Sequence, residues 1–248
     1  MHRRQLDWDG CLNVRDLGGH ETEDGRVTRF GRIVRADSVR RLSDSGWRAA
    51  VGYGVRTIVD LRFHEELEAD PPGEIPVEVV HVPALPVLPQ EVWSEIGAIG
   101  DAAPDPAAGT QAVYLELLER YPSGFAKAVA AVAAAPEGAV LVHCTAGKDR
   151  TGIATALLLR LARVPVAAVA ADYALSERNL ASLADPWIAE APDDRERTRR
   201  RRISKTPARA MVGVLHELER RHGDAAGYLH AAGLSAWELE RVHERLVG

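Results

Sequence analysis

Residues 138–163 constrain the fold more than any other part of this 248-residue chain. The run GAVLVHC (138–144) is apolar and rich in valine, which predicts a buried strand. The run RTGIATALLLRLAR (150–163) is longer and rich in Ala and Leu, which predicts a helix. A strand, a short loop and a helix in this order are typical of α/β proteins. The loop is therefore expected at the carboxyl end of a strand, where α/β proteins bind ligands.

The segments before this unit alternate between strand and helix patterns. Short β-branched runs bounded by Gly, Pro or charge predict strands, and longer mixed runs predict helices. We expect a single α/β domain over residues 1–248, with a central, mostly parallel sheet flanked by helices and a helical C-terminal third over residues 165–248. The expected strands are 31–38, 55–62 and 76–85, and the expected helices are 42–54, 111–121 and 123–135.

Residues 86–110 interrupt this pattern. Pro, Gly and Ala crowd the segment around a short apolar stretch that includes Trp93 and Ile96. A connection of this length in a compact domain is usually functional or mobile. We interpret it as a lid or mobile insertion.

The composition argues against several classes of function. With 31 Lys and Arg against 36 Asp and Glu, the net charge is -5, which argues against a general nucleic-acid binder. No run of about 18 or more apolar residues is present, so no transmembrane segment is expected. The N-terminus lacks the apolar core of a secretory signal, so a cytoplasmic location is expected, although export without a signal would leave no trace in the sequence.

Two cysteines, Cys11 and Cys144, are too few for a disulfide framework, and they lack the paired spacing of a zinc site. No metal or cofactor is therefore expected. A nucleotide-binding P-loop does not fit either, because Val142 and Asp149 occupy its first Gly and its Ser/Thr positions. A redox Cys-x-x-Cys is excluded by Gly147.

Cys144 stands at the start of a loop suited to binding an anion. A cysteine at the end of a buried strand is commonly a small apolar residue, but here its neighbours point to chemistry. Gly147 allows a tight turn, and the N–H groups of such a turn and of the following helix N-terminus bind anions and stabilise a thiolate. Arg150 can hold two oxygens of a phosphoryl group. The spacing Cys-x5-Arg therefore indicates a thiolate aimed at phosphorus.

The loop also resembles a known family. The run HCTAGKDRTG (143–152) resembles the signature loop of cysteine-dependent tyrosine and dual-specificity phosphatases. Its Lys-Asp pair is similar to the loops of atypical bacterial tyrosine phosphatases and of phosphoinositide phosphatases. Three further segments resemble the bacterial group: NVRDLGG (13–19), residues 31–62 ending in Asp-Leu-Arg, and DYALSERNL (172–180). The resemblance therefore covers most of the chain.

The resemblance implies a cysteine-phosphatase-type fold and a division of roles in the loop. Cys144 would attack phosphorus and form a phosphocysteine, and Thr151 would hydrogen-bond the departing thiolate. His143 would either assist through a hydrogen bond or be structural. Phosphate binding would fall to Thr145, Ala146, Gly147, Lys148 and Arg150.

The proton for the leaving oxygen has several candidate donors. The chain has no Trp-Pro-Asp acid loop upstream, and Asp101 and Asp105 lie in a Pro/Ala-rich context that favours solvent exposure. Asp149, inside the loop, is our candidate general acid. The alternative is a carboxylate that merely stabilises the helix N-terminus.

Four charged residues outside the loop are candidate supports. Asp60 and Arg62 lie at the end of the predicted strand 55–62, and Arg15 and Asp16 lie in the N-terminal motif. For all four, structural ion pairing is the favoured interpretation. Cys11 is a candidate partner for a protective disulfide with an oxidised Cys144.

These features predict a phosphomonoester hydrolase acting on phosphotyrosine proteins, with dual specificity as an extension. A second cation at Lys148 suits phosphoinositides, which are the first alternative. A catalytically silent phosphate-binding module is the second. The arginine cluster Arg197–Arg202 is interpreted as a solvated helix face, with peripheral contact to acidic lipids or peptides as the alternative.

Overall fold

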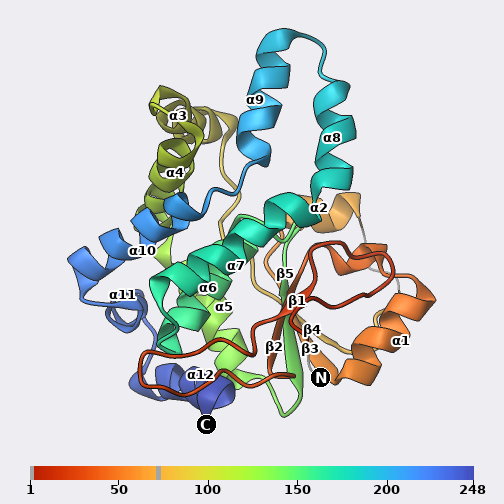
Figure 1. Ribbon diagram of the computed structural model, residues 1–248, viewed down its shortest axis with the longest axis vertical. Helices are drawn as coiled ribbons and strands as arrows, with labels where there is room; N and C mark the ends of the chain where they lie inside the picture. The colour runs from red at the N-terminus through yellow and green to blue at the C-terminus, as the bar shows by residue number, and fades with distance from the viewer. Residues whose placement is uncertain (1–2, 71–73) are drawn as a thin grey trace.

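The computed structural model describes residues 3–70 and 74–248, and a five-stranded sheet lies at its centre (Figure 1). The strand order is β1-β2-β5-β3-β4, with β1 antiparallel to β2 and the other neighbours parallel. The mostly parallel sheet predicted from the sequence is thus confirmed. The strands are β1 (Arg15–Asp16), β2 (Ile33–Ala36), β3 (Val55–Asp60), β4 (Glu78–His81) and β5 (Ala139–His143).

Side chains that alternate along the central strand pack into two separate cores. Leu141 of β5 faces a cluster beneath α1 (Asp44–Tyr53), whereas Val140 and Val142 face the larger core formed with α5 (Pro122–Ala134) and α6 (Arg150–Leu161). This two-residue alternation is the pattern expected of a strand covered by helices on both faces.

Helix α1 ends at the glycine that its sequence predicts, but it begins at Asp44 and not at residue 42. The Ser43 side chain accepts a hydrogen bond from the Gly46 N–H, and Gly54 ends the helix in a left-handed conformation with φ +107°. A 3-10 turn, η1 (Val39–Arg41), precedes it, and a short helix, α2 (His64–Ala69), follows β3. Helix α2 was not predicted from the sequence.

The segment interpreted as a lid contains regular structure. It forms α3 (Gln90–Ala102) and the first turn of α4 (Pro106–Arg120), so α4 starts five residues before the expected helix. Asp105 explains the early start, because its carboxylate accepts hydrogen bonds from Ala107 and Ala108 and the following residue is a proline. A Pro/Ala-rich composition therefore marks a helix start here, where the sequence had suggested an irregular connection.

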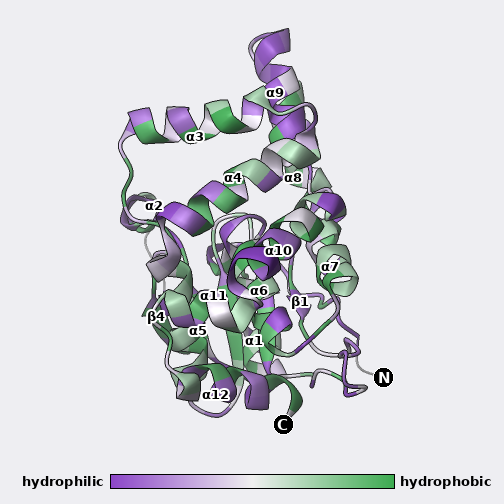
Figure 2. Cartoon of the chain, turned by 90° about the vertical axis from the view of Figure 1, so that its left-hand side faces the viewer, coloured by the Kyte–Doolittle hydropathy of each residue, from purple (hydrophilic) through white to green (hydrophobic). Residues whose placement is uncertain are grey.

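The C-terminal third is helical, as predicted, and α8 and α9 project from the body as a hairpin (Figure 1). Helix α9 is strongly hydrophilic (Figure 2). In the part of the chain that is described, no helix has both the length and the apolar character needed to cross a membrane. The helices of this third are α7 (Val166–Asn179), α8 (Ala181–Ala189), α9 (Asp194–Ser204), α10 (Ala208–His222), α11 (Ala225–Ala231) and α12 (Ala236–Val247).

Candidate active site

Cys144 lies at the carboxyl end of β5, the central strand of the sheet. Its side chain is buried, and α6 begins six residues later at Arg150. The loop between them is tied to the ends of both neighbouring strands: Ser38 N–H donates to the Thr145 carbonyl (3.0 Å) and Leu61 N–H to the His143 carbonyl (2.9 Å). The structure therefore places the predicted loop at the edge where three parallel strands end.

Gly147 is required by the path of the loop. Its φ is +62°, in the left-handed region, and a Cβ there would lie 2.1 Å from the Ala36 carbonyl oxygen. A side chain would therefore be strained by the backbone and would collide with the end of β2. The close approach of loop and strand depends on this glycine.

Two buried side chains hold the underside of the loop. Asn13 Nδ2 donates to the carbonyls of Ala146 (3.1 Å) and Gly147 (3.0 Å), and Arg35 Nη2 donates to the Gly147 carbonyl (2.8 Å). In a trans peptide the N–H points opposite to the carbonyl. The N–H groups of Gly147 and Lys148 are thereby directed to the other side of the loop, where they can bind an anion.

A charged network lies beneath these contacts. Asp172 of α7 pairs with Arg15 (3.0 Å) and with Arg35 (2.9 Å), and all three side chains are at most 1% exposed. Burial and the neighbouring Arg35 lower the pKa of Arg15 to about 10. Burial alone would raise the pKa of Asp172, but the two guanidinium groups hold it below its usual value. The two cations share this one carboxylate.

Arg15 also orients Asn13, because its Nη1 donates to Asn13 Oδ1 (2.6 Å). It thus reaches the loop through the asparagine amide. Asp16 belongs elsewhere: it accepts hydrogen bonds from the Tyr53 hydroxyl (2.6 Å) and from the Gly31 N–H (2.8 Å). The structure therefore brings the first of this predicted pair to the loop and assigns the second to the link between N-terminal segment and α1.

The guanidinium of Arg150 forms a two-point ion pair with Glu66 of α2. Nη1 lies 2.5 Å and Nη2 2.9 Å from the two carboxylate oxygens, and the guanidinium stacks 4.6 Å from the centre of the Phe63 ring. The Thr145 hydroxyl donates to the same carboxylate. Burial would raise the pKa of Glu66, but the hydrogen bonds from Arg150 and Thr145 lower it to about 2. Glu66 therefore carries a charge at any physiological pH.

Asp149 is half-exposed at the mouth of the loop. Its Oδ1 accepts a hydrogen bond from the buried hydroxyl of Tyr114 on α4 (2.5 Å) and lies 3.5 Å from Lys148 Nζ. Lys148 also contacts the Ile203 carbonyl at the end of α9. A cleft of about 720 Å³ opens beside these residues, with Trp93 among its apolar walls.

The remaining predicted residues lie at the carboxyl ends of β5 and β3 and in the first turn of α6. His143 Nδ1 is 3.0 Å from the Cys144 carbonyl, and its Nε2 is 3.6 Å from Asp60. Burial lowers the pKa of His143, so the ring is neutral. Asp60 and Arg62 form the expected ion pair, at 2.8 Å. Thr151 is fully buried, and among the described residues its hydroxyl has no hydrogen-bond partner.

Cys11 lies in the core on the α1 side of the sheet, whereas Cys144 belongs to the core on the α6 side. Both thiols are free. The Cys11 sulfur contacts the Ser38 carbonyl (3.6 Å), and burial strongly raises its pKa. It is therefore an unreactive thiol in this conformation.

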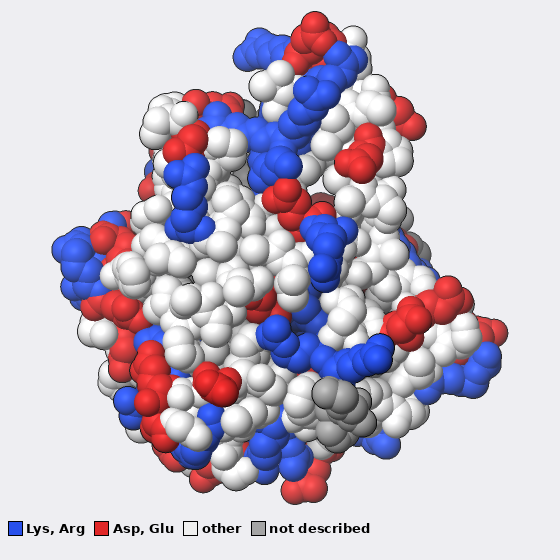
Figure 3. Space-filling model, viewed as in Figure 1, with Lys and Arg blue, Asp and Glu red and all other residues white. Residues whose placement is uncertain are grey.

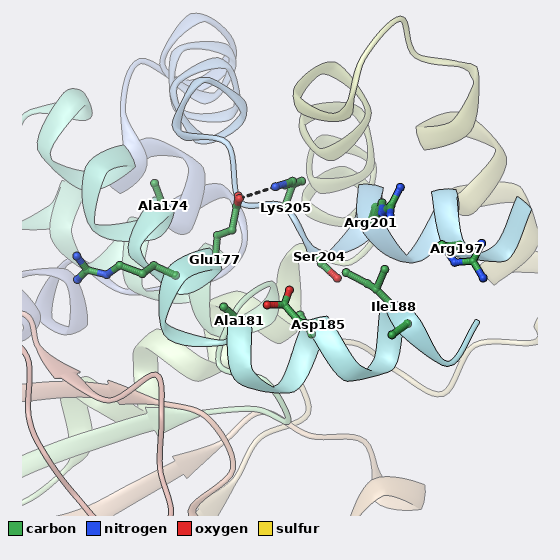
Figure 4. Close-up of a pocket in the computed structure, with 12 residues that line it drawn as sticks. Ala174, Glu177, Ala181, Asp185, Ile188, Arg197, Arg201, Ser204 and Lys205 are labelled. Carbon is green, nitrogen blue, oxygen red and sulfur yellow. Dashed lines mark hydrogen bonds and ion pairs between the residues drawn. The ribbon is translucent and has the colours of Figure 1, made fainter. Parts of the chain in front are cut away.

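A second cavity, of about 970 Å³, separates α8 from α9 (Figure 4). Arg197 and Arg201 of α9 line it across from Asp185 of α8, and Lys205 closes one side through its ion pair with Glu177 (2.8 Å). It is thus a charged groove within the projecting hairpin.

The arginine cluster Arg197–Arg202 is interspersed with acidic side chains (Figure 3). Its members form ion pairs with Asp194, Glu196 and Asp101. Asp101 is thereby bound to α9, and the other upstream aspartate, Asp105, caps α4. Much of the positive charge of the cluster is compensated locally.

The sequence reasoning missed five residues of this site. Three of them lie in segments that carried the family resemblance, namely NVRDLGG, residues 31–62 and DYALSERNL, and a fourth follows Asp-Leu-Arg by four residues, so the motifs held a usable signal. The fifth lies in an ordinary helix, where no local pattern marks it. The five are Asn13, Asp172, Glu66, Arg35 and Tyr114.

Comparison with known proteins agrees with this geometry. The model of a tyrosine phosphatase family matches residues 6–248. A tyrosine-protein phosphatase of Nostoc commune is 30% identical over 226 residues, which cover 86% of this chain and 74% of the relative. The triple specificity protein phosphatase PtpB of Mycobacterium tuberculosis is 27% identical over 274 residues, covering 96% of this chain and 98% of that protein. The resemblance read from the loop is confirmed: the chain belongs to the tyrosine phosphatase family and is a hydrolase of phosphoric monoesters.

Proposed function

We propose that this phosphatase cleaves phosphotyrosine in proteins through a phosphocysteine intermediate on Cys144. One observation carries the proposal: a buried thiol at the end of the central strand starts a loop whose carbonyls are held from below and whose arginine lies at its mouth. Such a loop directs N–H groups and a guanidinium toward one point. A phosphoryl group centred there would meet the thiolate.

The reaction takes place in two steps. The Cys144 thiolate attacks phosphorus, the bond between phosphorus and the tyrosyl oxygen breaks, and Asp149 gives that oxygen its proton. Water then attacks phosphorus, passes a proton to the Asp149 carboxylate, and the S–P bond breaks to release phosphate. The Thr151 hydroxyl stabilises the departing thiolate by a hydrogen bond. Phosphoryl transfer mainly requires positioning and charge stabilisation, which the loop and Arg150 supply.

Glu66 supports this chemistry by orienting Arg150. The two-point contact and the Phe63 ring hold the guanidinium in one plane. The loop also contributes fixed N–H groups from residues 145–150, with Lys148 as an added cation. His143, Asp60 and Arg62 support the backbone at the end of β5 and β3.

The decisive test of the nucleophile is Cys144→Ser with a phosphotyrosyl peptide. Hydrolysis should disappear, while binding of the peptide, measured calorimetrically, should persist because the loop is unchanged. Persistent hydrolysis would overturn the proposal. A wild-type protein that binds the peptide without cleaving it would favour the silent phosphate-binding module.

Phosphoinositides are the second candidate substrate, supported by the loop cation Lys148 and by Arg199 and Arg202 on the wall of the adjoining cleft. Turnover of phosphatidylinositol 3-phosphate and of phosphoseryl peptides should be compared with that of the phosphotyrosyl peptide. Faster turnover of the lipid would make it the substrate class. Comparable turnover of the two peptides would establish dual specificity.

Four further expectations remain predictions. These are a cytoplasmic location, mobility of residues 86–110, membrane contact through the arginine cluster and protection of Cys144 by Cys11. The local pairing of the cluster with acidic residues favours a solvated helix face. The placement of the two cysteines in different cores supports independent roles for them.

A further inference from the structure

Tyr114 makes the closest contact of the candidate general acid. Its ring is buried on α4, with 2% of the residue exposed, and its hydroxyl donates to Asp149 Oδ1 at 2.5 Å. Lys148 Nζ lies 3.5 Å from the same oxygen. Two groups thus engage Oδ1, and the side chain of Asp149 remains half-exposed at the cleft.

A second buried tyrosine donates a hydrogen bond to Tyr114. The hydroxyls of Tyr114 and Tyr173 are 2.9 Å apart, and their rings meet edge to face. Because Tyr114 has one proton and gives it to Asp149, Tyr173 must be the donor to the Tyr114 oxygen. The two hydroxyls thus form a chain of hydrogen bonds that ends at Asp149 Oδ1.

Asp149 also stands immediately before α6, in the N-cap position. An aspartate in that position ordinarily turns its carboxylate onto the free N–H groups of the first helical turn. Here the side chain makes no capping hydrogen bond. The carboxylate instead contacts Tyr114 and is directed toward α4 and the cleft.

We propose that Tyr114 is a positioning residue for the reaction, which holds Asp149 by Oδ1 so that Oδ2 carries the proton delivered to the leaving oxygen. The proposal rests on the proposed function, in which Asp149 is the general acid. Tyr173 is a second positioning residue, because it holds the Tyr114 hydroxyl in place. The leaving group is thereby assigned to the cleft that Tyr114, Lys148 and Asp149 line.

Tyr114 acts as a donor and not as the acid itself. Its complete burial, together with the charge of Asp149, raises the pKa of its hydroxyl well above the ordinary value. The phenol therefore keeps its proton throughout the working pH range. A group that retains its proton can orient the carboxylate in both halves of the reaction.

The test compares leaving groups of different basicity in Tyr114→Phe. Loss of the hydroxyl should lower kcat/KM, which reports the first step and not the hydrolysis of the phosphocysteine, about tenfold for alkyl phosphates, a fraction of the 10²–10⁴ that a general acid supplies. The kcat/KM for nitrophenyl phosphate, whose leaving group needs little protonation, should fall less than about twofold. Tyr173→Phe should show the same pattern more weakly.

Tyr228→Phe is the matched control, because it also removes a buried hydroxyl, one that donates to the Leu118 carbonyl (2.9 Å) away from the loop. It should leave both substrates unaffected. Equal losses for alkyl and aryl phosphates in Tyr114→Phe, or no loss, would overturn the proposal. If Tyr114→Phe does not fold, the leaving-group pattern of Tyr173→Phe decides in its place.

Asp149→Asn separates this proposal from the one on which it rests. If Asp149→Asn affects all leaving groups equally, the assignment of the acid fails. If Asp149→Asn shows the leaving-group dependence and Tyr114→Phe does not, only the role of the tyrosine fails. In Asp149→Asn, adding Tyr114→Phe should cause no further loss, because the positioned acid is already absent.

Discussion

The two sides of the phosphate loop differ in how their contacts are made. Below the loop, Asn13, Arg35 and Asp172 are almost completely buried and bind backbone or one another. At its mouth, the side chains of Glu66 and Asp149 are 28% and 48% exposed and bind other side chains. The buried side fixes the path of the loop, and the exposed side carries the side chains proposed to orient the arginine and to move the proton.

The largest effect is expected from breaking the buried side. Asp172→Asn leaves two buried guanidinium groups without their carboxylate, so the free energy of unfolding should fall by about 3–5 kcal/mol. Urea denaturation at neutral pH measures this. Glu177→Gln on the same helix removes a surface pair with Lys205 and should cost less than about 1 kcal/mol. Similarly small losses of stability in both variants would contradict a structural role for the buried side of the loop.

Next in size is the effect of Gly147→Ala on activity. The added Cβ would meet the Ala36 carbonyl and force the loop to shift, so kcat/KM should fall about 10²-fold, the cost of a displacement near 1 Å. Gly52→Ala in α1 is the control, since no atom lies within 4 Å of its added Cβ. That change should preserve activity and add up to about 1 kcal/mol of stability. Unchanged activity in Gly147→Ala would show that the loop is not held by β2.

The loop and its fold class could be predicted because their signals are local. The β-branched strands, the helix that ends at Gly54 and the Cys-x5-Arg spacing each lie within one short segment. The start of α4 was misplaced because Asp105-Pro106 resembles a turn as much as a helix cap. Helix α2 was missed because six residues with four charged or His side chains carry too little periodicity.

The supports of the loop could not be predicted in the same way. Asn13 and Asp172 are far from Gly147 in sequence and meet the site only after the sheet and α7 have packed. Tyr114 lies in an amphipathic helix, where an aromatic residue ordinarily indicates core packing. Periodicity predicts that such a side chain is buried, but not which polar atom its hydroxyl will meet.

A smaller effect is expected at the mouth of the loop. Glu66→Gln keeps the shape of the side chain but replaces a charged contact with a neutral one, so kcat/KM for a phosphotyrosyl peptide should fall about tenfold. Glu65→Gln, on the exposed face of the same helix, should have no effect. An increase in activity in Glu66→Gln would contradict the positioning role and would mean that the carboxylate competes with phosphate for Arg150.

The smallest effect concerns pH. The pKa of Glu66 is lowered to about 2 from its ordinary 4.5, so the charged contact is complete above the ordinary value and is lost only as the pH falls toward 2. The ratio of kcat/KM between wild type and Glu66→Gln should therefore be constant from about pH 5 to 8. A ratio that changes within this range would mean that Glu66 titrates during catalysis.

The most direct test of the central claim is to look for phosphate on Cys144 during turnover. A phosphotyrosyl peptide is mixed with the enzyme, and the reaction is stopped by rapid denaturation within one turnover. The enzyme is then digested with a protease, and the masses of its peptides are measured by mass spectrometry. The peptide that contains Cys144 should gain the mass of one phosphoryl group, and Cys144→Ser should gain none. Turnover without this adduct, or with the phosphoryl group on another residue, would contradict nucleophilic catalysis by the loop cysteine.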